Sequence, residues 1–143
     1  MVQLSRATTF YLNTSRAEGA CLPLQEAMAA GRPVLAPNHT AMADYIDSRV
    51  GFVLESHSEP TFWPHDPQRR YETTWHRLVW ADLYEKLQAS AELVAKERSL
   101  YDEMAAAARK RMQGFASRDI VADHYREALQ QLPEDRAAVS WAA

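Results

Sequence analysis

Near its start the chain alternates between strand-like and helix-like patterns with very short connections, and this alternation constrains the fold more than any other feature. "TTFYLNTS" (8–15) is rich in β-branched and aromatic residues and ends in turn formers, which predicts a buried strand followed by a loop. "PLQEAMAAG" (23–31) opens with a proline suited to a first helical turn and closes with a glycine, which predicts a short helix. "RPVLAP" (32–37) is apolar, as interior strands are. Strand, helix and strand in this order form a βαβ unit and imply a parallel sheet.

The remaining sequence predicts one more strand and then a helical half. Residues 38–54 predict a short helical segment and a third strand, "VGFVL". Residues 55–73 are polar and contain three prolines, which predicts a long inserted loop. Three helices are expected after it, at about 74–95, 99–114 and 118–131. The predicted class is therefore α/β: a partial Rossmann-like parallel sheet with a helical C-terminal half over residues 1–132, followed by a flexible tail at 133–143.

Two of the predicted helices contain residues whose positions on the helix can also be predicted. In the first, apolar residues recur at steps of three and four positions and predict one buried stripe: Trp75, Leu78, Val79, Leu83 and Leu87. In the last, Ser117 is suited to cap the N-terminus. The residues expected along one side of that helix are Ile120, Val121, His124, Tyr125, Ala128 and Leu129.

Composition and charge exclude several classes of function. The net charge is −3 and the pI about 5.9, so nothing favours a nucleic-acid partner. The sequence contains neither an apolar run of membrane-spanning length nor a signal-peptide pattern, and a cytoplasmic protein is expected. The single cysteine, Cys21, cannot form an internal disulfide, and the five histidines lack metal-binding spacing, so no metal site is predicted.

Two glutamates flank the start of the first predicted helix. Glu18 precedes the turn after the first strand, and Glu26 lies in the helix that follows. In parallel sheets, ligands bind at the carboxyl ends of the strands, and a helix N-terminus there offers free N–H groups to an anion. Carboxylates accept hydrogen bonds from sugar hydroxyls. A nucleotide sugar would fit this arrangement, although spacing alone favours two solvated charges stabilised by the helix dipole.

The surrounding motif reverses that preference. "TSRAEGACLPLQEAMAAGRPVLAP" resembles the donor-binding segment of glycosyltransferase family 4, with its pattern E-G-x-G-L-P-x-x-E-A-M-A-x-G-x-P-V. The resemblance continues through "HTAMADYI", "VGFVLE" and "MAAAARKRMQGFASRDIVADHYREALQQL", and covers most of residues 8–132. It implies the GT-B fold and a retaining transferase that uses a nucleoside-diphosphate sugar without a cofactor or a required metal.

The resemblance also implies roles for individual residues. Glu18 matches the glutamate that contacts the donor sugar and is associated with catalysis, and Glu26 matches the one that binds the ribose. The donor-binding segment between them consists of Gly19, Ala20, Cys21, Leu22, Pro23 and Leu24. Cys21 departs from the pattern, because a glycine that tolerates positive φ is usual there.

The same resemblance implies that the chain is the C-terminal part of a longer enzyme. Three strands make a poor free-standing sheet, and "MVQLSRA" looks like the end of a helix. The family's basic phosphate-binding residues and its acceptor site precede this region, so an N-terminal domain is expected and the chain alone is expected to be inactive. The acceptor could be a sugar, a glycan or a lipid. A solvated helix face is favoured for the basic residues at 109–111, although such a face would also suit peripheral membrane contact.

Alternatives remain at this level. The chain could be a non-catalytic module that binds a nucleotide or a protein; a sugar-nucleotide epimerase is a weaker third interpretation. His39 and Thr40 follow the second strand, where capping a loop is favoured over facing a ligand. Packing of the insertion against the helices is favoured over a sugar-stacking or acceptor surface for the aromatic residues Phe62, Trp63, Tyr71, Trp75 and Trp80.

Overall fold

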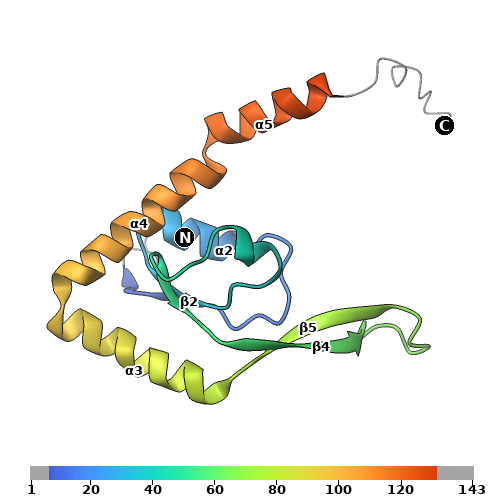
Figure 1. Ribbon diagram of the computed structural model, residues 1–143, viewed down its shortest axis with the longest axis horizontal. Helices are drawn as coiled ribbons and strands as arrows, with labels where there is room; N and C mark the ends of the chain where they lie inside the picture. Colours follow the sequence, from blue (N-terminus) through green and yellow to red (C-terminus); the bar gives the residue numbers. More distant parts are fainter. Residues whose placement is uncertain (1–6, 132–143) are drawn as a thin grey trace.

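The centre of the molecule is a three-stranded parallel sheet. The computed structural model describes residues 7–131, and within them the strands are β1 (Tyr11–Leu12), β2 (Val34–Ala36) and β3 (Gly51–Val53), in the spatial order β1-β2-β3 (Figure 1). Tyr11 lies opposite Val34, which lies opposite Gly51. The predicted α/β class, with a partial Rossmann-like parallel sheet, is confirmed. The predictions for residues 1–6 and for the tail at 133–143 lie outside the described residues.

The crossover from β1 to β2 contains the helix α2 (Leu22–Ala29). Its buried side chains are Leu24, Ala27 and Met28, and two of them, Leu24 and Met28, belong to a core cluster with Val34 of β2. Gly31 ends it with φ +73° and donates its N–H to the Met28 carbonyl, a left-handed stop that glycine adopts without a Cβ penalty. The 3₁₀ helix η1 (Thr40–Asp44) then connects β2 to β3. Both segments were predicted at these places.

Both faces of the sheet are covered, as a parallel sheet requires. On one face, side chains of β2, α2, η1 and α4 (Arg98–Ala116) form the larger core cluster, which includes Leu24, Met28, Val34, Met42, Tyr45, Ala108 and Met112. On the other face, Leu35 packs with Leu54, Leu78 and Leu83, and the last of these belongs to α3 (Trp80–Lys96). The alternation of Val34, Leu35 and Ala36 between the two clusters follows from the two-residue period of a strand.

The predicted loop at 55–73 is wrong. The chain there forms an antiparallel hairpin of β4 (Ser56–Phe62) and β5 (Glu72–Leu78), with Ser56 opposite Leu78. Prolines are tolerated because a two-stranded ribbon has two open edges where no ladder bond is lost. The tip is held by the Asp66 carboxylate, which accepts hydrogen bonds from the backbone N–H groups of Gln68, Arg70 and Tyr71.

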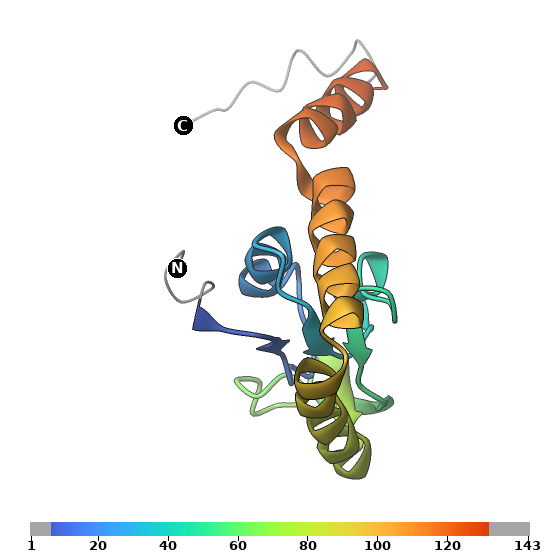
Figure 2. The same ribbon diagram turned by 90° about the vertical axis from the view of Figure 1, so that its left-hand side faces the viewer.

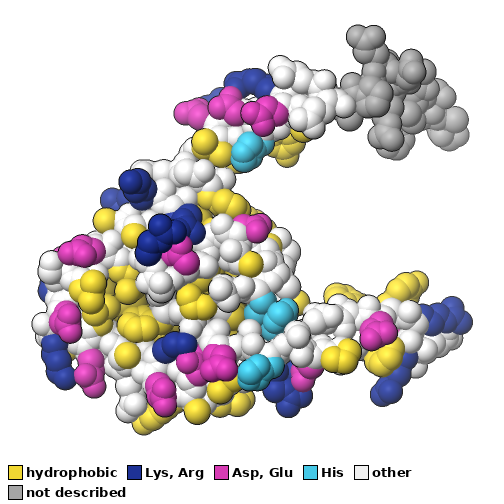
Figure 3. Space-filling model, viewed as in Figure 1, with side chains coloured by type: hydrophobic (Ala, Val, Ile, Leu, Met, Phe, Trp, Pro, Cys, Tyr) yellow, Lys and Arg dark blue, Asp and Glu magenta, His cyan; other side chains and the backbone are white. Residues whose placement is uncertain are grey.

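The first predicted helix consequently starts later than expected. Trp75 and Leu78 belong to β5 rather than to a helical stripe, and α3 begins at Trp80. Packing of the insertion's aromatic residues against the helices is also wrong for the side chains that remain exposed: Phe62, Trp63, Tyr71 and Trp80. Figure 3 shows the hairpin as a narrow arm with hydrophobic and basic side chains toward its outer end.

The last helix, α5 (Arg118–Gln130), continues away from the sheet beyond α4 (Figures 1 and 2). The predicted cap is confirmed, because the Ser117 hydroxyl accepts a hydrogen bond from the Ile120 N–H. None of its residues is buried, so the predicted apolar side, including Tyr125 and Leu129, faces solvent. Within residues 7–131, none of the helices has the length and apolar character needed to cross a bilayer.

The pairing of β2 with β3 depends on a close backbone approach at Gly51. A Cβ added there would lie 2.0 Å from the Val34 carbonyl oxygen, which is backbone and cannot rotate away. We expect Gly51→Ala to lower the free energy of unfolding by about 3 kcal/mol or more, because the strands would have to separate. Urea denaturation of the variant measures this loss.

Gly114 supplies the matched control. It lies in α4, and a Cβ added there meets no atom within 4 Å. Gly114→Ala should therefore raise the free energy of unfolding by up to about 1 kcal/mol through helix propensity. Equal stabilities of the two variants would contradict the role given to the Gly51 contact.

Candidate functional site

A hollow lies at the carboxyl end of β1, where the chain turns toward α2. Its lining comes from β1, the following loop and the first residues of the helix: Tyr11, Leu12, Asn13, Thr14, Ser15, Glu18, Cys21 and Pro23. The hollow therefore combines a carboxylate, hydroxyl groups and a helix N-terminus. This edge of a parallel sheet is where ligands bind in doubly wound folds.

Glu18 is fixed in this hollow by hydrogen bonds on both its side chain and its backbone. The Ser15 hydroxyl donates to Glu18 Oε1. The Glu18 N–H donates to Thr40 Oγ1 at 3.1 Å, and the Glu18 carbonyl accepts from the Ala41 N–H at 3.5 Å. The carboxylate is thus aimed by its own loop and by the start of η1.

His39 joins the two segments that hold Glu18. Its Nε2 lies 3.1 Å from the Ser15 carbonyl oxygen and must donate to it, and its Nδ1 lies 3.2 Å from the Thr40 hydroxyl, which donates to the neutral form of the ring. Burial lowers its pKa, and the His76 ring stacked on it at 4.0 Å between centroids lowers the pKa further. The loop-capping role expected for His39 and Thr40 is present, and what they cap is the Glu18 loop.

The turn between the two predicted glutamates has a left-handed residue at its centre. Cys21 is the N-cap of α2 with φ +53°, although it has a side chain where a glycine would be unstrained. Its buried Sγ accepts a hydrogen bond from Asn13 Nδ2 at 2.7 Å. Burial raises the pKa of the thiol, and the Glu18 carboxylate adds to the rise, so the thiol stays protonated.

Consecutive backbone N–H groups in this turn have no acceptor among residues 7–131. Within the described residues, the structure records no intramolecular hydrogen bond from the N–H groups of Gly19, Ala20, Cys21 and Leu22. Pro23 has none to offer, and the next helical N–H, that of Leu24, is bonded to the Cys21 carbonyl. Unpaired amides around a left-handed residue at a helix N-terminus form a concavity suited to an anion.

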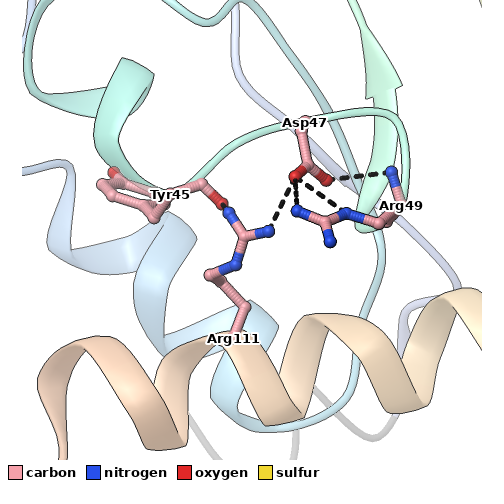
Figure 4. A network of polar contacts seen from close by, with 4 residues as sticks. All are labelled: Tyr45, Asp47, Arg49 and Arg111. Carbon is pink, nitrogen blue, oxygen red and sulfur yellow. Dashed lines mark hydrogen bonds and ion pairs between the residues drawn. The ribbon is translucent and has the colours of Figure 1, made fainter.

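The turn is supported from beneath by Tyr45. Its hydroxyl donates to the Ala20 carbonyl oxygen at 2.7 Å, and burial raises the pKa of Tyr45 to about 12. Its own carbonyl accepts from Arg111 Nη1 at 3.0 Å (Figure 4). The Asp47 carboxylate accepts hydrogen bonds from both Arg49 and Arg111. These two guanidinium groups hold the pKa of the Asp47 carboxyl well below its usual range. Arg111 is therefore part of a structural network that ties α4 to the site.

Glu26 does not share the hollow of Glu18. It lies on the exposed side of α2 and lines a separate hollow between α2 and α4, together with Leu22, Gln25, Ala29, Arg109, Met112, Gln113, Ala116 and Ser117. Cys21 and Pro23 border the first hollow and Leu22 borders the second, so the turn lies between them. The two carboxylates therefore border different hollows, and residues of the turn line both.

Sequence reasoning missed the supporting residues Asn13, Ser15 and Tyr45. The role of Tyr45 depends on a contact with a distant segment, for which the local pattern of the chain has no signal. Asn13 and Ser15 could have been noted as polar residues at the end of a buried strand. In the part of the chain that the structure describes, no three His, Cys, Asp or Glu side chains gather as metal ligands.

Comparison with known proteins gives one match. Residues 1–62 match the family model for glycosyl transferases group 1. The matched segment includes Glu18, the turn and Glu26, and ends at the last residue of β4. No curated protein and no solved structure matches the chain. The match supports a general role in glycosyl transfer, with sugar donor and acceptor as the corresponding partners.

The neutral state of His39 makes folding pH-dependent. Because the folded pKa of His39 lies below its unfolded value, the unfolded chain binds more protons near pH 6.5, and stability falls as the pH drops through that value. We expect the free energy of unfolding to decrease between pH 7.5 and about pH 5.5 in the wild-type chain, and to decrease less in His39→Gln. Urea denaturation across this pH range measures both slopes.

His124→Gln is the control for that experiment, because His124 lies on the exposed helix α5. It should keep the wild-type slope. If His39→Gln showed the wild-type slope as well, the neutral, hydrogen-bonded imidazole would not describe His39.

Proposed function

We propose that this chain binds the nucleoside-diphosphate sugar of a retaining glycosyltransferase of the family 4 type with the GT-B fold. The observation that carries the proposal is a turn of unpaired amides whose residues line two hollows, one with Glu18 and one with Glu26. A nucleotide sugar has the complementary order of groups: a sugar, a diphosphate and a ribose. The family match over residues 1–62 supports the same assignment.

In this proposal the diphosphate binds the N–H groups of residues 19–22. The partial positive charge at the N-terminus of α2 adds to their attraction. During transfer, negative charge develops on the leaving diphosphate, and donors that are already in place stabilise it without reorganising. The Tyr45 hydrogen bond to the Ala20 carbonyl keeps that carbonyl turned away from the phosphate side.

Glu18 is the proposed catalytic residue. Its carboxylate would accept hydrogen bonds from hydroxyl groups of the transferred sugar, and it would stabilise the positive charge that develops at the anomeric carbon. Ser15 and Thr40 set its position before the donor arrives. Such pre-organisation matters because a small displacement of a catalytic group lowers the rate strongly.

Glu26 is the proposed ribose ligand. It lies beyond the turn in the second hollow, where the exposed side of α2 leaves its carboxylate accessible. A carboxylate can accept hydrogen bonds from both ribose hydroxyls. Charged hydrogen bonds of this kind contribute about 1.5–3 kcal/mol each to the free energy of binding. Separation of the two hollows by the turn is what a donor with a central diphosphate requires.

A non-catalytic protein-binding module is the second candidate. The observation that favours it is the uncovered apolar side of α5, where Tyr125 and Leu129 are exposed. The two candidates differ in whether the chain binds a sugar nucleotide through its two glutamates.

We expect titration calorimetry to distinguish the two candidate functions. The ligands are UDP, GDP and ADP, each with and without an attached glucose. Glu26→Ala should weaken binding of both the diphosphate and its glucose conjugate by about 10-fold or more, because both carry the ribose. Glu18→Ala should weaken binding of the glucose conjugate alone, because only that ligand has the transferred sugar.

Glu85→Ala, on the exposed side of α3, is the control and should bind like the wild type. Failure of all these nucleotides to bind would overturn the proposed function. So would an equal effect of Glu26→Ala and the control variant.

A further inference from the structure

A second hollow adjoins the one that contains Glu18. It is lined by Thr14, Arg16, Arg77, Leu78 and Trp80, and Thr14 also lines the Glu18 hollow. The two hollows therefore meet at the end of β1. Three of the lining residues, Arg77, Leu78 and Trp80, lie beyond the segment that matches the family model.

Two arginines give this hollow an excess of positive charge. Arg16 and Arg77 both form ion pairs with Glu59, at 2.7 Å in the case of Arg77. One carboxylate shared by two guanidinium groups leaves a net charge of about +1, and each guanidinium has five N–H donors to use. The Arg77 side chain is 69% exposed and the Arg16 side chain 45%, so both can reach a ligand.

Trp80 adds an accessible aromatic surface. It is the first residue of α3 and is 72% exposed, although its neighbours in the sequence are anchored. Leu78 is buried against Leu83, and Val79 donates its N–H to the Glu55 carbonyl at 3.0 Å. The indole is therefore presented from a fixed backbone and is not packed under another element. An exposed indole on a fixed backbone can stack on the apolar face of a sugar ring.

The hairpin side of the hollow is attached to the Glu18 loop. The His76 N–H donates to the Arg16 carbonyl at 2.8 Å, and the Arg16 guanidinium lies 4.6 Å from the centroid of the Trp75 ring. The His76 ring stacks on His39, which holds Ser15. These contacts fix the distance between the two hollows, so ligands in them would have a defined relative position.

We propose that this hollow adds to the acceptor site expected in the N-terminal domain and is a subsite for an anionic carbohydrate, a sugar with a phosphate or a carboxylate group. The proposal rests on the proposed function. Trp80 stacks on the sugar ring, and Arg16 and Arg77 bind the anionic group. A hydroxyl group of the same ring then points past Thr14 toward the donor sugar beside Glu18.

Transfer of the sugar forms one bond and breaks another. The hydroxyl oxygen of the bound carbohydrate forms the new bond to the anomeric carbon of the donor sugar. The bond from that carbon to the diphosphate breaks, and its electron pair stays on the diphosphate. The proton of the hydroxyl passes to the same diphosphate oxygen.

Binding of small probes to the 143-residue chain tests the subsite. Titration calorimetry would compare glucose 6-phosphate, glucuronate, glucose and inorganic phosphate. We expect either or both anionic sugars to bind at least 10-fold more tightly than glucose and than inorganic phosphate. Trp80→Ala and Arg77→Gln should each weaken that binding by 10-fold or more.

Tyr84→Ala is the matched control, since Tyr84 is an exposed aromatic residue on the same helix outside the hollow. It should bind the anionic sugars like the wild type, and equal melting temperatures of the two alanine variants would show that both are folded. Equal losses in Trp80→Ala and Tyr84→Ala would overturn the proposal, as would absence of binding. Inorganic phosphate binding as tightly as the anionic sugars would overturn it too.

The two proposals fail separately. Trp80→Ala should keep nucleoside diphosphate binding, and Glu26→Ala should keep binding of the anionic sugar. If the anionic sugar binds through Trp80 and no nucleotide binds, the carbohydrate site is supported and its role as an acceptor site is refuted together with the donor function.

Discussion

The hydrogen bond from the Tyr45 hydroxyl to the Ala20 carbonyl connects the candidate site to the rest of the fold. Tyr45 is fully buried, its ring packs on Phe115 of α4, and its carbonyl is held by Arg111. The turn before α2 is therefore fixed by a residue of the next crossover and by a helix from the C-terminal half. Without that support, a turn with several unpaired amides would have little reason to keep one conformation.

The hairpin supports the other side of the same loop. Its contacts with Arg16 and His39 combine a backbone hydrogen bond, a cation–π contact and a stacked pair of rings. Exposed ion pairs such as Arg16 with Glu59 contribute little to stability one at a time. They act here by orienting guanidinium groups whose backbone and aromatic contacts are already fixed. The segment that matches a family and the segment that does not are thus in contact beside the Glu18 loop.

The features that could be predicted are those that depend on short stretches of the sequence. The βαβ unit followed from strand and helix patterns, and Gly31 and Ser117 marked helix ends that the structure confirms. Local patterns hide the hairpin, because the prolines at 55–73 favour a loop and because Trp75 and Leu78 also fit helical spacing. Tyr45 and Arg16 could not be found from the sequence, since each acts on a partner in another segment.

Cys21 shows how strain and packing are balanced at the centre of the turn. A left-handed conformation costs a residue with a side chain about 1–2 kcal/mol relative to the right-handed one. Glycine would avoid this cost, but it would leave empty the place that the thiol fills in the larger core cluster, and it would remove the acceptor of the Asn13 amide. Asn13 in turn accepts from the Ser15 N–H, and the Ser15 hydroxyl donates to Glu18. The side chain that makes the turn strained is therefore the one that links it to the catalytic carboxylate we propose.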